Sequence, residues 1–134
     1  MRESRKSVAK SPNQQIKVAV TSEYLPAHSD PTQQLWFFAY HVTIENLGTE
    51  RVQLLSRHWI VTNANGHKEH IRGPGVVGNQ PLIQPGQRYE YSSGCPLNTS
   101  MGSMQGTYQM VDSAGHQFDA AIEAFVLVDP LDLN

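Results

Sequence analysis

A regular alternation of apolar and polar side chains between residues 35 and 47 constrains the fold of this chain most strongly. Successive side chains of a β-strand point to opposite faces, so an alternation with a period of two indicates a half-buried strand. Large apolar residues fill one face of this segment: Trp36, Phe38, Tyr40, Val42 and Ile44. The other face carries His41, Thr43 and Glu45. The segment therefore predicts one long strand with an aromatic core face.

Related patterns predict strands along most of the chain. They cover residues 16–24, 52–63, 67–72, 87–93, 104–110 and 118–127. Asn65-Gly66 supplies the positive φ that a tight hairpin needs, and Pro85-Gly86 suits the centre of a type II turn. About seven strands and no helix are expected.

The last of these segments contains a change of parity. Phe118 and Ile122 are apolar at even positions, whereas Phe125 and Leu127 are apolar at odd positions. One extra residue near Glu123 or Ala124 restores a single core face, so we predict a β-bulge there.

The number and spacing of the strands predict an all-β fold. In a chain of 134 residues, they favour an immunoglobulin or fibronectin type III-like β-sandwich of about seven antiparallel strands over a closed barrel. Trp59 is expected in the core, because large aromatic residues dominate such cores. Residues 1–14 are polar and basic, with Arg2, Arg5, Lys6 and Lys10, and are expected to form a flexible N-terminal arm. Residues 15–134 are expected to form one domain.

Composition excludes several classes of function. Ten basic and twelve acidic residues leave a formal charge of -2, which gives the whole chain no electrostatic attraction to nucleic acid or to an anionic membrane. No segment has the ~20 apolar residues of a membrane span, and the N-terminus lacks the apolar core of a secretion signal. Cys95 is the single cysteine, which excludes an internal disulfide and suits a reducing compartment. A cytoplasmic location is expected.

Gly73, Gly75 and Gly78 match the G-x-G-x-x-G spacing of loops that bind a pyrophosphate. Such a loop needs a helix after it, and none is predicted here, so we reject the nucleotide fingerprint. A nest of backbone N–H groups, with the charge of Arg72 beside it, stays open as an anion site. A strand edge whose glycines adopt φ values closed to other residues is the better supported interpretation.

Candidate metal ligands and nucleophiles are few. His67, Glu69 and His70 form the densest group of ligand residues, but on an extended strand His67 and His70 point to opposite faces. They could bind one ion only if the backbone turned. Cys95 could be approached in space by His58 or His116, yet no spacing marks it as a nucleophile, and a buried inert thiol is expected. No cofactor and no catalytic residue are predicted.

Arg57 is the least expected residue of its segment, because it shares a parity with Trp59 and Val61. If that parity faces the core, Arg57 points inward and needs a carboxylate, such as Glu45 or Glu90, or several carbonyl acceptors. Alternatively, a bulge near Ser56 turns Arg57 outward, beside an exposed His58, into a strip suited to partner contact. Both interpretations stay open.

Several long segments resemble one known family. They read LLSRHWI from residue 54, GPGVVGNQP from residue 73, PGQRYEYSSGCPLNTSMGSMQGTYQM from residue 85 and FDAAIEAFVL from residue 118. These motifs are similar to those of the bacterial ApaG family, over nearly the whole chain after residue 14. The chain departs from the family pattern at Pro74, where a glutamate is usual, and at Glu123, where a proline is usual. The missing glutamate puts a cation role in doubt for the loop that contains Gly73, Gly75 and Gly78, which we call the glycine loop.

The resemblance implies a fibronectin type III-like sandwich, a cytoplasmic protein and no established catalysis. Related domains occur fused to an F-box and in a protein that interacts with a DNA polymerase, and there they are thought to bind partners. Bacterial members are associated with cobalt and magnesium homeostasis and with a gene neighbourhood that contains a diadenosine tetraphosphatase.

We therefore expect a non-enzymatic module that binds a protein or a small ligand. Arg57, His58, Arg72, Gly73, Gly75 and Gly78 are the candidate contacts. The alternative is a sensor of divalent cations or of a nucleotide polyphosphate, at the glycine loop or at His67 and His70. The partner's identity is not encoded in a motif, nucleic acid and membrane are not expected, and a homodimer through edge strands is possible.

Overall fold

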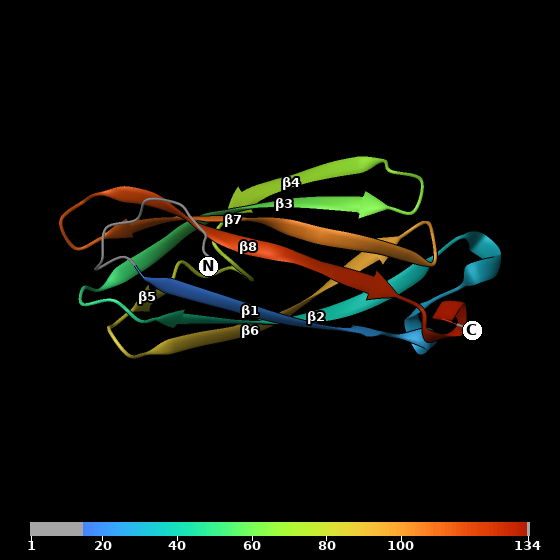
Figure 1. Cartoon of the computed structure of the whole chain (residues 1–134), viewed down its shortest axis with the longest axis horizontal. Helices are drawn as coiled ribbons and strands as arrows, with labels where there is room; N and C mark the ends of the chain where they lie inside the picture. The colour runs from blue at the N-terminus through green and yellow to red at the C-terminus, as the bar shows by residue number, and fades with distance from the viewer. Residues whose placement is uncertain (1–14, 134) are drawn as a thin grey trace, which may run out of the picture.

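The computed structural model describes residues 15–133, which form eight β-strands and three short 3₁₀ turns (Figure 1). No α-helix occurs in this range. The strands are β1 Ile16–Tyr24, β2 Trp36–Asn46, β3 Val52–Asn63, β4 Lys68–Pro74, β5 Leu82–Ile83, β6 Arg88–Leu97, β7 Met101–Asp112 and β8 Gln117–Val128. The 3₁₀ turns are η1 Pro26–His28, η2 Pro31–Gln33 and η3 Pro130–Leu133. The arm predicted for residues 1–14 lies outside the described residues.

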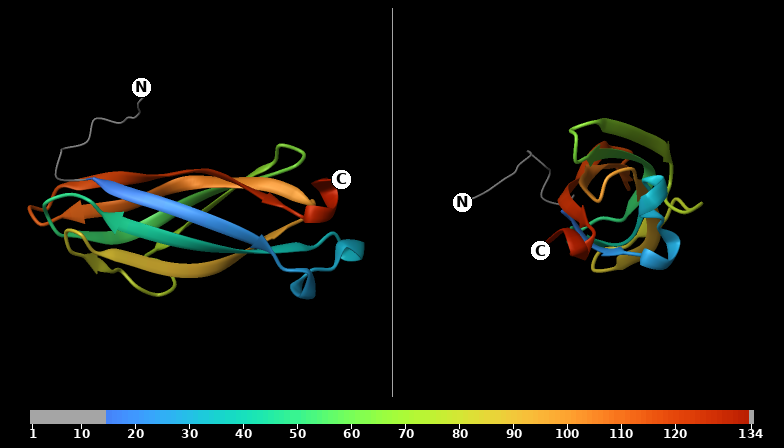
Figure 2. Two further views of the ribbon diagram at one scale, coloured as in Figure 1. Left: turned by 60° about the horizontal axis from the view of Figure 1, so that its bottom comes forward. Right: turned by 90° about the vertical axis from the view of Figure 1, so that its right-hand side faces the viewer.

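Two antiparallel sheets pack face to face, as Figures 1 and 2 show. The smaller sheet has the order β1-β2-β6, and the larger has the order β4-β3-β7-β8, with β5 also paired to β3. β1 lies along β8 at one side of the sandwich. The predicted β-sandwich is confirmed. The strand that the sequence pattern does not indicate is β5, whose two residues lie in a proline-rich segment.

The core lies between the two sheets and follows the predicted alternation. Phe38, Tyr40, Val42 and Ile44 of β2 are buried, while the residues between them are half exposed. Trp59 of β3 is 2% exposed. Burying these large side chains supplies the main driving force for folding, at roughly 25 cal/mol per Å² of apolar surface.

Two β-bulges set which residues face the core. In β8, Glu123 and Ala124 lie opposite a single residue of β7, because Met104 pairs with Phe125 and Gly106 with Ile122. The predicted bulge is therefore confirmed. In β3, Leu54 pairs with Met110 and Ser56 with Gln109, so Leu55 is an extra residue.

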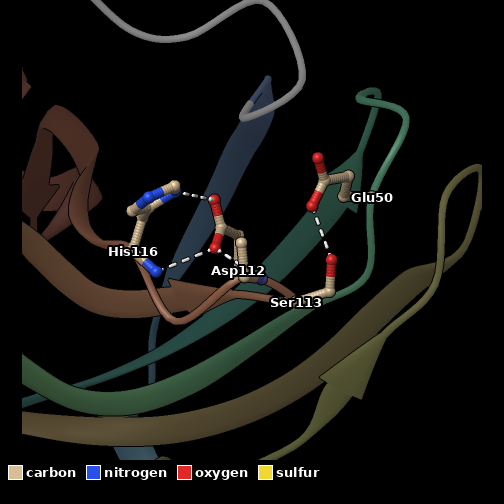
Figure 3. Close-up of polar contacts among 5 residues, drawn as sticks. Glu50, Asp112, Ser113 and His116 are labelled. Carbon is tan, nitrogen blue, oxygen red and sulfur yellow. Dashed lines mark hydrogen bonds and ion pairs between the residues drawn. The ribbon is translucent and has the colours of Figure 1, made fainter.

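The turns also follow the sequence. Gly66 and Gly86 have φ of 85° and 80°, as the hairpin and the type II turn require. The β7–β8 turn is held by Asp112, whose carboxylate accepts hydrogen bonds from the backbone N–H of Ala114 and of His116 and contacts His116 Nδ1 at 3.3 Å. The turn is tied to the β2–β3 loop by Ser113 Oγ, which donates to Glu50 (Figure 3).

No helix in residues 15–133 has the length and the apolar character that a membrane crossing needs.

Candidate functional site

Arg57 points toward the inside of the sandwich. The bulge at Leu55 shifts the parity of β3, so that Arg57 falls on the same side as the buried residues Trp59 and Val61. Its pairing partner on β7 is Tyr108, which is fully buried. The bulge near Ser56 is thus present, but the interpretation in which it turns Arg57 outward is wrong.

The guanidinium of Arg57 is satisfied by backbone carbonyls at the end of β4. Nη1 donates to Pro74 O at 3.0 Å and to Gly75 O at 2.9 Å. The guanidinium passes over Gly73, where a Cβ atom would lie 2.9 Å from Nη2. Arg57 therefore fastens the glycine loop to the sandwich.

In the described part of the chain, neither proposed carboxylate pairs with Arg57. Glu45 lies 3.7 Å from Arg88, and Glu90 lies 2.8 Å from His41 Nε2. The acceptors of Arg57 come from a segment that follows it by 17 and 18 residues, which spacing within one strand does not reveal.

Arg57→Ala is expected to lower the free energy of unfolding by about 1–3 kcal/mol, because two carbonyls lose their donor. Thermal unfolding should show a Tm lower by about 5–10 °C. Arg88→Ala is the matched control, since its exposed ion pair contributes at most about 1 kcal/mol. An Arg57→Ala protein as stable as the wild type would contradict this role.

Three tyrosines lie next to the inward-facing Arg57. The hydroxyls of Tyr91 and Tyr108 are 2.5 Å apart, and Tyr40 is the third member. Burial raises the pKa of each hydroxyl, and the charge of Arg57 offsets only a small part of this increase. The hydroxyls are therefore neutral at physiological pH and act as hydrogen-bonding groups of the core.

A hollow of about 590 Å³ lies beside Arg57. It crosses all four long strands of the larger sheet, and its lining consists of Ser56, Arg57, His58, Arg72, Gly73, Pro74, Gln109 and Asp119. We call it the outer hollow, because Ser56 and His58 have the parity opposite to Trp59. Four of the six predicted contact residues line it; Gly75 and Gly78 belong to the adjoining loop.

The polar groups of the outer hollow come from facing positions of the sheet. Ser56 Oγ donates to Gln109 Oε1 at 2.8 Å, and Asp119 is the pairing partner of Gln109 on β8. His58 lies opposite Arg72. Partial burial and then the charges of Arg72 and His70 lower the pKa of His58, so this imidazole is neutral at physiological pH.

The glycine loop closes on itself instead of opening toward a ligand. Gly75 N donates to Leu55 O at 2.9 Å, and Val76 and Asn79 exchange two backbone hydrogen bonds. Val77 and Gly78 have φ of 47° and 82°, as in a type I′ turn. Because the N–H groups of Gly75, Val76 and Asn79 already donate to backbone carbonyls, the geometry does not favour the anion nest.

Val77 is strained, since a β-branched residue rarely adopts a positive φ. Val77→Asn gives the Asn-Gly pair that type I′ turns prefer, and it is expected to raise the free energy of unfolding by about 1 kcal/mol. Urea unfolding measures the change, with Val126→Asn as a control on an exposed strand position. A less stable Val77→Asn protein would show that the valine side chain is needed for packing.

The histidines that the sequence grouped as ligands lie apart. His67 and Glu69 line a second hollow, of about 400 Å³, between the β3–β4 hairpin and the end of β6. His70 instead contacts His58, with His58 Nε2 2.9 Å from His70 Nδ1. Among residues 15–133, no three His, Cys, Asp or Glu side chains gather to hold a metal ion.

Cys95 is buried on β6. Burial, and to a smaller extent the carboxylate of Glu69, raise the pKa of its thiol to about 11. The thiol lies 3.7 Å from Pro96 O, whereas His58 contacts His70 and His116 contacts Asp112. Neither histidine is thus placed to activate the thiol.

Native Cys95 is expected to react slowly with iodoacetamide at pH 8, because a pKa of about 11 leaves about 100-fold less thiolate than the ordinary value of 9.0. Mass spectrometry gives the alkylation rate, and the same protein in urea is the control. Equal rates in the native and unfolded protein would contradict the burial of the thiol.

A family model described as the ApaG domain matches residues 26–112. The chain belongs to the ApaG domain family. Among relatives of this ApaG domain, Protein ApaG of Azotobacter vinelandii is 52% identical over 119 residues, which cover 89% of this chain and 94% of that protein. Protein ApaG of Afipia carboxidovorans is 53% identical over 116 residues, which cover 87% and 89%.

A solved structure shares the fold of this ApaG domain. The crystal structure of the ApaA protein from Bordetella pertussis superposes with a TM-score of 0.84 and 47% sequence identity, over 87% of this chain and 94% of that one. The family resemblance and the sandwich fold are both confirmed.

Sequence reasoning missed the outer hollow's residues on β7 and β8. The strand order β3-β7-β8 and the register bring these residues into one row, in which Ser56 pairs with Gln109 and Gln109 with Asp119. The alternation along β7 and β8 could have shown that Gln109 and Asp119 face outward. The sequence did not show which strands pair, and therefore not that these residues lie near Ser56.

Proposed function

We propose that this ApaG domain is a non-enzymatic binding module that holds a protein partner across the outer hollow. The observation that carries the proposal is that charges of both signs flank the hollow on a rigid sheet. Arg72 lies on β4 and Asp119 on β8, about 15 Å apart by the spacing of neighbouring strands. Within residues 15–133, neither side chain has a hydrogen-bond or ion-pair partner.

This arrangement suits a polar segment of a folded or extended protein. A partner with an acidic side chain over Arg72 and a basic one over Asp119 would match the charges, while Ser56, His58 and Gln109 offer hydrogen bonds between them. Complementary charges increase the rate of association and select the partner.

The absence of catalysis is part of the proposal. Catalysis of acyl or phosphoryl transfer needs a nucleophile or a general base that is free to contact the substrate. The thiol of Cys95 is buried with a raised pKa, and the hydroxyl of Ser56 is bound to Gln109. The outer hollow thus offers hydrogen-bonding and charged contacts to a partner, but no activated nucleophile.

Charge reversal tests the proposal. The tagged full chain, Arg72→Glu and Asp119→Lys are used to capture proteins from the native cells, and the captured proteins are identified by mass spectrometry. We expect each reversal to lose the same protein, because it places like charges at the interface.

Arg51→Glu and Glu23→Lys are the matched controls, since they reverse exposed charges away from the outer hollow. They are expected to retain the partner. Capture that is the same for all five proteins, or absent for all, would contradict the proposal. Circular dichroism checks that every variant is folded.

The sensor alternative has less support from the geometry. Three N–H groups of the loop already donate to backbone carbonyls, so we expect no thermal shift with pyrophosphate or with diadenosine tetraphosphate. A saturable rise of several degrees would favour the sensor instead, because a ligand of the native state raises its stability. In our proposal, the effect on cobalt and magnesium homeostasis that is associated with the family would be exerted by the bound partner.

A further inference from the structure

A serine, a histidine and a glutamate form a hydrogen-bonded chain on the outer face of the smaller sheet. His41 Nδ1 lies 2.8 Å from Ser92 Oγ, and His41 Nε2 lies 2.8 Å from Glu90 Oε1. The pairing of β2 with β6 explains this arrangement, because His41 is directly opposite Ser92, and Glu90 is opposite Thr43, the next residue of β2 on the same face. The imidazole therefore lies between the hydroxyl and the carboxylate.

The carboxylate decides which nitrogen of His41 carries the hydrogen. An ionised carboxylate only accepts hydrogen bonds, so Nε2 bears the hydrogen that is donated to Glu90. In the neutral ring, Nδ1 is then left with a lone pair, which accepts the hydrogen bond that Ser92 Oγ donates. A serine bound to a base that a third group orients is the arrangement that makes this hydroxyl a nucleophile.

The backbone N–H of Ser92 points away from the sheet. Asn46 N donates to Gln87 O, and the pairing of β2 with β6 continues from there without a register shift. Because the N–H groups of a strand point alternately to its two sides, Ser92, an odd number of residues after Gln87, directs its N–H away from β2. β6 is the last strand in the order β1-β2-β6, so within residues 15–133 this N–H lies on a free sheet edge. The N–H of the nucleophile itself is one of the donors that stabilise the oxyanion in serine proteases.

We propose that Ser92 is a site of covalent acylation that takes an activated acyl donor, such as an ester with a good leaving group. Ser92 Oγ attacks the carbonyl carbon while its proton moves to His41 Nδ1, and the charge of Glu90 stabilises the imidazolium. The bond from that carbon to the leaving group then breaks, the leaving group departs as an anion, and the ring releases its proton to water. The product is an ester between the acyl group and Ser92.

The site is accessible, and it does not depend on the partner proposed for the outer hollow. The side chains of His41 and Glu90 are 44% and 49% exposed, and Ser92 is exposed, so a donor reaches the hydroxyl from solvent. The reaction stops after one acyl group, because a serine alkoxide is a stronger base, and so a poorer leaving group, than the anion of an activated ester. Modification without turnover is compatible with a non-enzymatic module.

Acetylation of the full chain by p-nitrophenyl acetate at pH 7.5 tests the proposal, with peptide mass spectrometry to follow the acetylation of Ser92 over time. We expect Ser92 to react at least about tenfold faster in the wild type than in His41→Ala, because the variant lacks the general base. Glu90→Gln should also react slowly. Its amide can donate to Nε2, which holds the ring hydrogen on Nδ1, where the ring cannot accept the proton of Ser92.

Ser22 and His116 supply the matched controls. Ser22 is an exposed serine of the same sheet whose hydroxyl donates to a backbone carbonyl, so it should be acetylated at least about tenfold more slowly than Ser92. His116 also contacts a carboxylate, and His116→Ala should leave the acetylation of Ser92 unchanged. Equal rates at Ser92 and Ser22, an unchanged rate at Ser92 in His41→Ala, or continued release of nitrophenolate that Ser92→Ala abolishes would overturn the proposal.

Discussion

Trp59→Ala is expected to lower the free energy of unfolding by about 3–5 kcal/mol. The indole is 2% exposed and makes edge contacts with Tyr40, Tyr108 and Phe125, at centroid distances of 5.4, 6.3 and 5.9 Å. Its removal leaves a cavity where the two sheets meet. Urea unfolding followed by circular dichroism gives the free energy by linear extrapolation.

Trp59→Phe is the matched variant and should cost less than half as much. It keeps an aromatic ring and removes the indole N–H, which is buried without a hydrogen-bond partner among the described residues. Because this N–H has no acceptor, its removal leaves no buried acceptor without a hydrogen bond and adds no free-energy cost of that kind. A Trp59→Ala protein within 1 kcal/mol of the wild type would show that the core can collapse around the gap.

Gly75→Ala is expected to lower the free energy of unfolding by about 2–4 kcal/mol, the second largest effect. Two costs combine at this position. Its φ is +59°, which disfavours any Cβ, and the Cβ would lie 2.2 Å from Asn79 O. The loop must then open, and the carbonyl of Gly75 moves away from Arg57. Urea unfolding measures the loss.

Gly78→Ala separates the two costs. Gly78 has a φ of +82° but no heavy atom within 4 Å of a Cβ, so only the conformational cost of about 1 kcal/mol applies. Equal losses in the two variants would mean that the loop relaxes freely and that the contact with Asn79 is unimportant.

The local elements of the fold were predictable from the sequence because their signals are short-range. The alternation in β2, the turns at Gly66 and Gly86, and the bulge at Glu123 and Ala124 all depend on residues a few positions apart. Burial of one apolar face fixes the parity of a strand, so a break in parity shows a bulge directly. β5 was not predicted from the sequence, because its two residues lie between prolines and are too few to show a periodicity.

The candidate site was predictable only in part. Arg57, His58, Arg72 and Gly73 were predicted as contact residues, and they do line one hollow. The direction of Arg57 depended on the bulge at Leu55 and on carbonyls from the following hairpin. Similarly, the choice of His58 rather than His67 as the neighbour of His70 depended on the register of β3 with β4.

The sequence by itself determined that this ApaG domain is a β-sandwich, where most of its strands and turns lie, and which aromatic residues form the core. It could do so because periodicity and turn chemistry are local properties of the chain. Only the tertiary structure decided that Asp119 joins Arg72 at the outer hollow and that His58 meets His70. Strand order and register arise from pairing between distant segments, and that pairing is set by the packing of the whole core.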